Sequence, residues 1–160
     1  MANSLRDIAI AHIEEARTQW TKEHTTIVAR PVMDGSVPNV MLWMCSIPGR
    51  NTTDWAGGKY QMRMIFDNNY PTKPPKCMFD RNFFHPNVYP SGLIYMSLLD
   101  EDDGWRPNTT IREILEGVQD LLAWPDKTKP VQDSFDLYFK DHEAYKTRVR
   151  QQAASYLVSH

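Results

Sequence analysis

The spacing of apolar residues changes twice along this chain, and these changes restrict the folds that it can adopt. Residues 5–20 carry apolar side chains at every third or fourth position, which predicts an amphipathic helix. From residue 27 to residue 66 the spacing becomes that of strands, and helical spacing returns over residues 111–122. A helix followed by consecutive strands and then by further helices predicts an α+β fold, with helices packed against an antiparallel sheet.

Four strands are predicted, each bounded by turn residues or prolines. They are residues 27–32, 40–47, 59–66 and 76–79. Asp34-Gly35 marks the first turn between them. Pro71, Pro74 and Pro75 require an irregular loop before the fourth strand, because proline cannot donate a hydrogen bond to a sheet.

The predicted helices have recognisable first residues. Two pairs have the spacing of a capping box: Ser4 with Asp7, and Thr110 with Glu113. The first helix is predicted to end near Lys22. After the break at Trp124-Pro125, a short helix is predicted over residues 132–139, and Asp141 is predicted to cap a last helix.

Length and charge exclude several classes of protein. The 160 residues suffice for one domain, residues 1–160, and a hydrophobic content of 41% suffices for its core. With 18 basic and 20 acidic residues the net charge is −2, so no basic excess favours a nucleic-acid partner. No apolar run approaches the roughly 20 residues that cross a bilayer, and the N-terminus lacks the apolar core of a secretion signal. We expect a protein of the cytoplasm or nucleus that uses no membrane, metal or cofactor.

The most distinctive sequence lies in residues 80–108, a long stretch without regular structure, and such loops usually carry function. It contains His-Pro-Asn-Val-Tyr-Pro-Ser-Gly at residues 85–92, an acidic turn at residues 100–103, and Trp-Arg-Pro at residues 105–107. Together with the proline-rich loop at residues 70–75, these motifs resemble the ubiquitin-conjugating (UBC) fold, and within that family they look most like the SUMO-conjugating enzymes. The resemblance covers nearly the whole chain.

The resemblance implies a UBC fold, with a four-stranded antiparallel sheet, an N-terminal helix and C-terminal helices. It also implies a transfer reaction, in which a cysteine thiolate accepts the C-terminal acyl group of a ubiquitin-like protein from an activating enzyme and passes it to a substrate lysine. In the resembled enzymes an asparagine stabilises the oxyanion or the loop, and an aspartate helps to desolvate and deprotonate the lysine.

Tyr95 stands at the position that the resemblance assigns to the cysteine. A phenol, whose ordinary pKa is about 10, is ionised far less than a thiol at neutral pH, and its oxygen is the weaker nucleophile. No residue nearby in sequence offers an activating base, so we expect no thioester exchange at Tyr95. Cys45 and Cys77 lie within predicted strands and are expected to be inert core residues.

Lys129 falls at the position of the aspartate, provided that the loop before it contains no gap. An ammonium at this position would repel an incoming lysine instead of favouring it. Asp126 and Asp133 remain alternatives that could approach the same space.

Asn87 is retained at the position of the asparagine, but a structural role is the better interpretation. In a His-Pro-Asn turn, an asparagine side chain commonly ties the loop together through backbone hydrogen bonds. We therefore expect His85, Pro86 and Asn87 to brace this loop, with His85 not acting as a base.

Two surfaces could still bind partners. On the first helix, Arg17 and Lys22 match basic positions through which the resembled enzymes contact SUMO and the activating enzyme, whereas Thr18 and Thr21 stand in place of further cations. Loss of these charges is expected to weaken SUMO binding without necessarily abolishing it. An ordinary solvated helix face is the alternative interpretation.

The second surface is the rim around Tyr95, where the resemblance implies recognition of an aliphatic-Lys-x-acid motif. The residues of this rim are Lys76, Met78, Tyr89, Ser91 and Leu93. Met78 and Leu93 stand in place of a cation and a hydroxyl, so the rim is more apolar and suits an apolar partner surface better than an acidic one.

The leading interpretation is a catalytically inactive relative of the SUMO-conjugating enzymes that acts as a non-covalent binding or regulatory module. Its expected partners are SUMO or another ubiquitin-like protein, the activating enzyme, ligases or conjugation substrates. One alternative is a working transferase whose cysteine was replaced or whose acyl carrier is another residue. The other is a UBC-like domain that binds an unrelated protein through Met78 and Leu93, outside this pathway.

Overall fold

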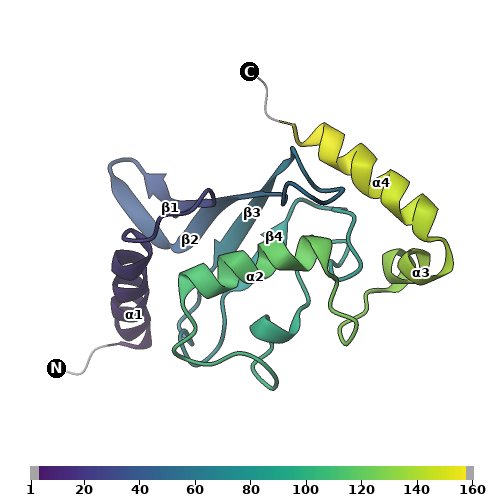
Figure 1. Cartoon of the computed structure of the whole chain (residues 1–160). Helices are drawn as coiled ribbons and strands as arrows, with labels where there is room; N and C mark the ends of the chain where they lie inside the picture. The colour runs from purple at the N-terminus through teal and green to yellow at the C-terminus, as the bar shows by residue number, and fades with distance from the viewer. Residues whose placement is uncertain (1–3, 158–160) are drawn as a thin grey trace.

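The computed structural model describes residues 4–157 as a four-stranded sheet with helices before and after it (Figure 1). The elements are α1 (Leu5–Trp20), β1 (Val28–Asp34), β2 (Val37–Pro48), β3 (Lys59–Ile65), β4 (Lys76–Phe79), the 3-10 turn η1 (Ser97–Leu99), α2 (Ile111–Ala123), α3 (Gln132–Lys140) and α4 (His142–Ser155). The predicted α+β fold, with its N-terminal helix and C-terminal helices, is confirmed.

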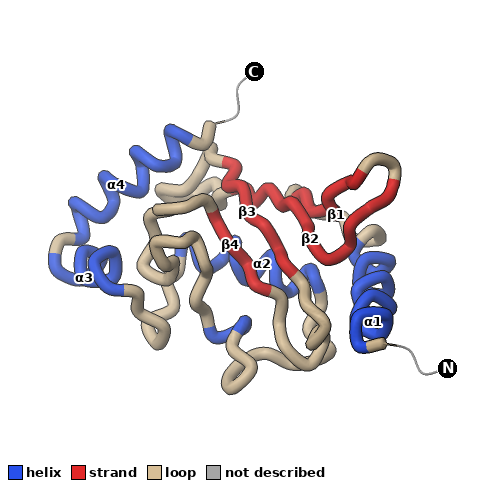
Figure 2. The backbone as a smooth tube through the Cα atoms, turned by 180° about the vertical axis from the view of Figure 1, so that it is seen from behind, coloured by secondary structure: helices blue, strands red, loops and turns tan. Residues whose placement is uncertain are grey.

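The sheet is an antiparallel meander in the order β1-β2-β3-β4, as the sequence predicts. Burial alternates along β3, where Tyr60, Met62 and Met64 are buried between exposed neighbours. Figure 2 shows the sheet from the side opposite to α2. Because the side chains of a strand point to alternate faces, one face of β3 joins the core and the other meets solvent.

Helix α2 supplies the largest apolar stripe of the core. Its side chains at spacings of three and four residues are buried, namely Ile111, Ile114, Leu115, Val118, Leu121 and Leu122. Burial of each large aliphatic side chain contributes about 1.5–3 kcal/mol. The predicted capping box is present, since Thr110 accepts a hydrogen bond from the Glu113 N–H and the Glu113 carboxylate accepts one from the Thr110 N–H. This helix is therefore fixed at its first turn and along one face.

Some predicted boundaries were wrong by a few residues. Helix α1 ends at Trp20 instead of near Lys22, where the Trp20 indole N–H donates to the Ala29 carbonyl and the chain turns toward β1. The first hairpin is longer than predicted because pairing continues up to Asp34 and Val37. Gly35 lies in the turn with a φ of +64°, a conformation that favours glycine.

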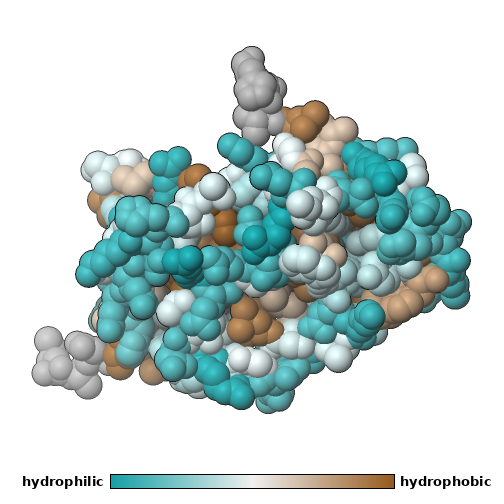
Figure 3. Space-filling model, in the orientation of Figure 1, coloured by the Kyte–Doolittle hydropathy of each residue, from teal (hydrophilic) through white to brown (hydrophobic). Residues whose placement is uncertain are grey.

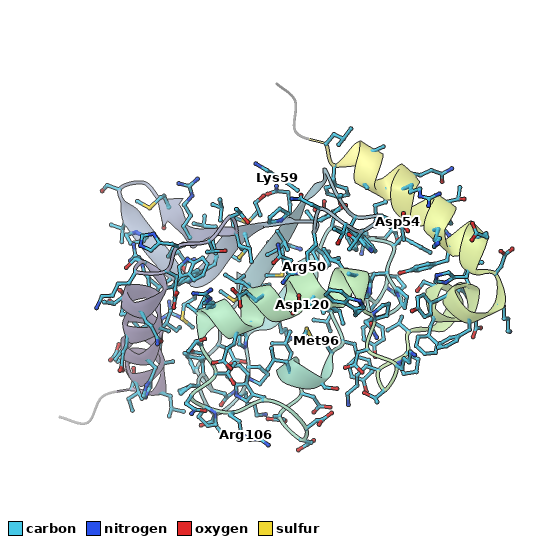
Figure 4. All side chains as sticks on the ribbon, viewed as in Figure 1. Arg50, Asp54, Lys59, Met96, Arg106 and Asp120 are labelled. Carbon is cyan, nitrogen blue, oxygen red and sulfur yellow. The ribbon has the colours of Figure 1, made fainter. Side chains whose placement is uncertain are left out.

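The long segment between β4 and α2 has little regular structure, in agreement with the prediction, and it passes beneath α2 (Figure 1). Met96 of this segment is buried, and Figure 4 places it below α2. On the other side of α2, the Arg50 guanidinium donates to the Asp120 carboxylate at 2.8 Å, which fastens the loop after β2 to the helix (Figure 4). The irregular segment therefore packs against a fixed element.

The surface seen from the side of α2 is mostly hydrophilic, with small separated hydrophobic patches (Figure 3). Within residues 4–157, no helix has the length and apolar character needed to cross a membrane. The same residues contain no cluster of three or more histidine, cysteine, aspartate or glutamate side chains arranged to hold a metal ion.

Candidate functional site

The turn at residues 85–87 is buried beneath the loop that carries Tyr95. His85 is 1% exposed; its Nδ1 accepts a hydrogen bond from the Asn87 N–H at 3.0 Å, and its Nε2 lies 2.7 Å from the Leu121 carbonyl oxygen. A ring that accepts at Nδ1 and donates from Nε2 is the neutral tautomer. Burial lowers the pKa of His85 to about 4, so the ring stays neutral at physiological pH.

The Asn87 side chain connects this turn to the loop after α2. Its Nδ2 donates to the carbonyl oxygens of Asp126 and Lys129, both at 2.7 Å, and its Oδ1 accepts from the Asp126 N–H at 2.8 Å. The Pro86 carbonyl accepts a further bond from the Val131 N–H at 2.9 Å. Both amide hydrogens of Asn87 are thus engaged, so stabilising an oxyanion would require one of these bonds to break. These contacts favour the bracing role expected for residues 85–87.

Tyr95 follows a short antiparallel bridge between Val88 and Ile94. Its N–H donates to the Asn87 carbonyl at 2.7 Å, so the buried turn also fixes the backbone of Tyr95. Its half-buried ring stacks against the ring of Tyr89, with centroids 5.7 Å apart and an interplanar angle of 29°. An aromatic platform therefore occupies the position that the resemblance assigns to a cysteine.

Lys129 lies directly beside this platform. Its Nζ is 5.3 Å from the centroid of the Tyr95 ring, within the range of a cation–π contact. The same ammonium donates to Asp100 Oδ2 at 2.7 Å and lies 3.6 Å from Asp103 Oδ2, and the Lys129 side chain is only 13% exposed. The hydrogen bond with Asp100 raises the pKa of Lys129 and lowers that of Asp100, so both groups keep their charges.

Neither alternative aspartate replaces Lys129 at this position. The Asp126 carboxylate accepts hydrogen bonds from the N–H and hydroxyl of Ser97 and from the N–H and hydroxyl of Thr128. Burial would raise the pKa of Asp126, but these bonds outweigh it and lower the pKa to about 2. Asp133 is exposed in α3 and lines a different cavity, beside Phe84. The structure thus brings Lys129 to the Tyr95 ring, engages the Asp126 carboxylate with Ser97 and Thr128 at the edge of the same site, and places Asp133 at another cavity.

Two of the five predicted rim residues, Lys76 and Met78, lie in β4, and the other three lie in the turn at residues 89–93. Met78 of β4 forms an antiparallel bridge with Leu93, and the Ser91 hydroxyl accepts from the Leu93 N–H at 3.3 Å. Gly92 has a φ of +97°, and a Cβ there would lie 2.1 Å from the Phe79 carbonyl oxygen, so this turn requires glycine. The remaining members are Lys76, which is exposed, and Tyr89, which is 39% exposed.

The two cysteines are free and buried in the sheet. Burial raises the pKa of the Cys45 thiol to about 12, and it raises the pKa of the fully buried Cys77 thiol as well. A thiol in such surroundings is neither ionised nor accessible, which agrees with the prediction that both are core residues.

The second predicted surface lies on α1. Arg17 is half-buried and its guanidinium is 3.6 Å from Glu14, while Lys22 is exposed just beyond the helix. The hydroxyl of Thr18 donates to the Glu14 carbonyl at 2.9 Å, and that of Thr21 donates to the Thr18 carbonyl at 2.8 Å. This face is therefore polar but carries little unpaired positive charge.

Sequence reasoning missed Asp100, Asp103 and Ser97 as neighbours of the site. Asp100 and Asp103 belong to the acidic turn at residues 100–103, and the structure shows that Asp100 binds Lys129 and that Ser97 binds Asp126. Two complementary pairs were the available signal: Lys129 in the loop after α2 is opposite in charge to Asp100, and Asp126 in the same loop can accept a hydrogen bond from Ser97. Nothing in the sequence shows that the two loops meet.

Comparison with known proteins places the chain in a family. The sequence model of the family described as "Ubiquitin-conjugating enzyme" matches residues 12–153. The SUMO-conjugating enzyme SCE1 of Arabidopsis thaliana is 48% identical over 153 residues, which cover 93% of this chain and 95% of that protein. The SUMO-conjugating enzymes named UBC9 in Caenorhabditis elegans and ubc9 in Dictyostelium discoideum are each 42% identical, over 93% of this chain and over 92% and 96% of their own lengths. This chain belongs to the SUMO-conjugating branch of the ubiquitin-conjugating enzyme family.

Family membership confirms the fold and the resemblance on which the site was predicted. The roles of Tyr95, Lys129 and the rim residues remain predictions, since each rests on matching single positions to the family's motif. What the structure adds is their arrangement, with an aromatic ring and a neutralised lysine in contact on a braced loop.

Proposed function

We propose that this chain is a member of the SUMO-conjugating branch that carries no acyl group and acts as a non-covalent binding or regulatory module in the conjugation of a ubiquitin-like protein. Its partners on this proposal are SUMO or a related modifier, the activating enzyme, ligases or conjugation substrates. The rim around Tyr95 and the exposed face of α1 are the surfaces that would contact them.

The observation that carries this proposal is the contact between Tyr95 and Lys129. A thioester carrier needs an accessible thiolate, and the described residues contain two thiols, both buried, with raised pKa values. Tyr95 offers a phenol, and the charged group that contacts its ring is the Lys129 ammonium, held by Asp100. A protonated ammonium is an acid and cannot serve as a general base. The two groups that would have to act as nucleophile and base therefore lack the required chemistry.

A charging assay tests the proposal. The protein is incubated with a SUMO-activating enzyme, SUMO and ATP and run on a non-reducing gel, with the Arabidopsis relative as a positive control. We expect the relative to form a thiol-sensitive band at its own mass plus one SUMO, and this chain to form none. A thiol-sensitive adduct of this chain would overturn the proposal.

Binding is measured separately, by titrating SUMO into the isotope-labelled protein and following amide resonances. Shifts confined to α1 would support the modifier as a partner. A lack of any shift with SUMO, the activating enzyme and a ligase would overturn the assignment to this pathway.

A working transferase is the second candidate function. Identity of 42–48% over more than nine tenths of the chain favours it, because the relatives are named as conjugating enzymes. The charging assay separates the two candidates, and resequencing of the source transcript shows whether Tyr95 replaces a cysteine.

A further inference from the structure

A cavity away from Tyr95 lies between the loop after β2 and the two C-terminal helices. Its volume is about 330 Å³, and its walls come mainly from residues 52–55, from Tyr138 of α3 and from one face of α4. Asp54 of the loop lies beside α4 (Figure 4), where its carboxylate accepts a hydrogen bond from the Arg150 guanidinium at 2.9 Å. Small-molecule sites occupy roughly 300–1,000 Å³, so this cavity suits a small ligand or a single side chain of a partner.

Tyr145 of α4 brings a buried donor without a partner to this cavity. The residue is 5% exposed, and its hydroxyl makes no hydrogen bond with any described residue. Burial raises the pKa of Tyr145, and the charges of Tyr138 and Asp54 raise it further, so the hydroxyl stays protonated. Because Tyr138 and Asp54 both line the cavity, the hydroxyl lies on the cavity side of the ring. A buried donor left unpaired costs free energy, which a hydrogen bond to a ligand oxygen would offset.

The charged side chains of the lining favour an anion. Asp54 is the one carboxylate among the described lining residues, and Arg150 neutralises it. His142 donates from Nδ1 to the Tyr138 carbonyl at 3.1 Å. Lys146 is half-buried, and in the described part of the chain its ammonium lies within 4 Å of no carboxylate. The cavity therefore has one unneutralised cation and no unneutralised carboxylate in its described lining, and such a cation can pair with an anionic ligand.

The aromatic rings of the lining do not favour a cationic ligand. An aromatic cage holds an ammonium against open ring faces. Here the Tyr145 ring stacks on the His142 ring, with centroids 5.6 Å apart, and packs at 88° to the Tyr138 ring, with centroids 4.9 Å apart. These rings cover one another, and Lys146 would repel an incoming cation.

We infer that this cavity binds a phosphomonoester, with the Lys146 ammonium paired to the phosphate and the Tyr145 hydroxyl donating to one of its oxygens. A phosphate carries up to two negative charges and three acceptor oxygens, so it can engage both groups at once. A free phosphorylated metabolite and a phosphorylated side chain of a protein share this chemistry. The inference goes beyond the proposed function and does not depend on it, because no lining residue belongs to the rim, to α1 or to residues 85–95.

Titration of the isotope-labelled protein tests the inference, with amide resonances as the readout and ionic strength held low and constant. The phosphate probes are glycerol 3-phosphate and a capped peptide with one phosphoserine between glycines. We expect at least one of them to shift the amides of residues 52–55 and 142–149 to saturation, and acetate and tetramethylammonium to bind about fivefold or more weakly. Tighter binding of the peptide supports a phosphorylated protein segment as the source, and tighter binding of glycerol 3-phosphate supports a free metabolite. Failure of both phosphate probes to saturate these amides, or equally tight binding of acetate or tetramethylammonium, would overturn the inference.

Lys146→Gln tests the contribution of the cation. We expect the affinity for the phosphate probe to fall about fivefold at low ionic strength. Lys127→Gln is the matched control, because Lys127 is an exposed lysine outside the cavity lining, and it should leave the affinity within about twofold of the wild type. An equal loss from both variants, or no loss from Lys146→Gln, would show that Lys146 does not hold the phosphate, and the inference fails.

Tyr145→Phe removes only the hydroxyl. Because this hydroxyl has no partner among the described residues, we expect the urea midpoint of unfolding to be no lower than that of the wild type, while the affinity for the phosphate probe falls about threefold. Tyr156→Phe is the control, since the Tyr156 hydroxyl donates to Asp80, outside the cavity. It should lower the midpoint and leave the affinity unchanged. Unchanged affinity in Tyr145→Phe contradicts the inferred contact between the hydroxyl and the phosphate.

Discussion

The ammonium of Lys129 donates a 2.7 Å hydrogen bond to the carboxylate of Asp100, a residue 29 positions earlier in the chain. This bond joins the segment that follows Tyr95 to the loop after α2, and it places a cation beside the tyrosine ring. The Asn87 side chain holds the loop after α2 through the carbonyls of Asp126 and Lys129. The Asp126 carboxylate in turn holds the segment after Tyr95 through Ser97. The site is thus a set of braced loops with its charges paired internally.

His85 should make folding stability depend on pH. Its pKa is lowered from 6.5 to about 4 by burial, so the unfolded chain binds a proton in this range while the folded chain does not. The free energy of unfolding is unaffected by this group above pH 6.5 and decreases as the pH falls toward 4, because the unfolded chain then takes up a proton that the folded chain does not. A pKa shift of this size corresponds to about 3 kcal/mol of stability.

Urea unfolding of the wild type and of His85→Gln from pH 7.5 to pH 4 measures this contribution. We expect the wild type to lose stability steeply below pH 6.5 and the variant, although less stable at pH 7, to lose less. His12→Gln is the control, because His12 is exposed on α1, and it should follow the wild type. Parallel curves for wild type and His85→Gln would contradict the assignment.

Asn87→Ala should destabilise the fold. The substitution removes three hydrogen bonds and leaves the Asp126 N–H and two carbonyl groups without their partners in a buried place. We expect the free energy of unfolding to fall by about 2–4 kcal/mol in urea titrations. Asn108→Ala, at an exposed asparagine before α2, should change it by less than about 0.5 kcal/mol. If Asn87→Ala lowers the free energy of unfolding no more than Asn108→Ala does, Asn87 does not brace the loop.

The elements of the fold could be predicted because their signals are local. The apolar positions of α2 recur at helical spacing, and its capping box spans four residues. The alternation of apolar and polar side chains along β3 is visible within its seven residues. The strand order follows because consecutive strands are joined by segments without a helix, residues 35–36, 49–58 and 66–75, and strands joined in this way usually pair as neighbours. The errors were at ends of elements, such as Trp20, where a tertiary hydrogen bond to Ala29 decides the boundary.

The contacts of the site could not be predicted in the same way. Tyr95, Lys129 and Asn87 were identified through the resemblance, but the pairing of Lys129 with Asp100 depends on the path of two irregular loops. The same holds for Ser97 with Asp126, and for Arg50 with Asp120, which are 70 residues apart. Neither periodicity nor turn chemistry specifies where such loops approach each other.

Added positive charge on α1 should strengthen binding of SUMO. Thr18→Lys places a cation on the exposed face beside Arg17, and electrostatic attraction mainly raises the association rate. We expect affinity to rise about three- to fivefold at low ionic strength and the gain to disappear near 1 M salt. Thr147→Lys on α4 is a matched control, since both threonine hydroxyls donate to the carbonyl four residues earlier. An equal gain from both variants would indicate general charge attraction and not a binding face on α1.

Restoring the missing chemistry tests whether only the reaction centre has changed. Tyr95→Cys supplies a smaller and more nucleophilic side chain, and Lys129→Asp removes the ammonium and supplies a carboxylate beside it. We expect the double variant to form a thiol-sensitive adduct with SUMO in the charging assay and to transfer it to free lysine about tenfold or more faster than Tyr95→Cys alone, since general-base assistance contributes at least that much. Tyr95→Ala with Lys129→Asp should form no adduct. If the double variant also forms none, docking of the activating enzyme has been lost as well, and the resemblance predicts that this docking surface lies on α1.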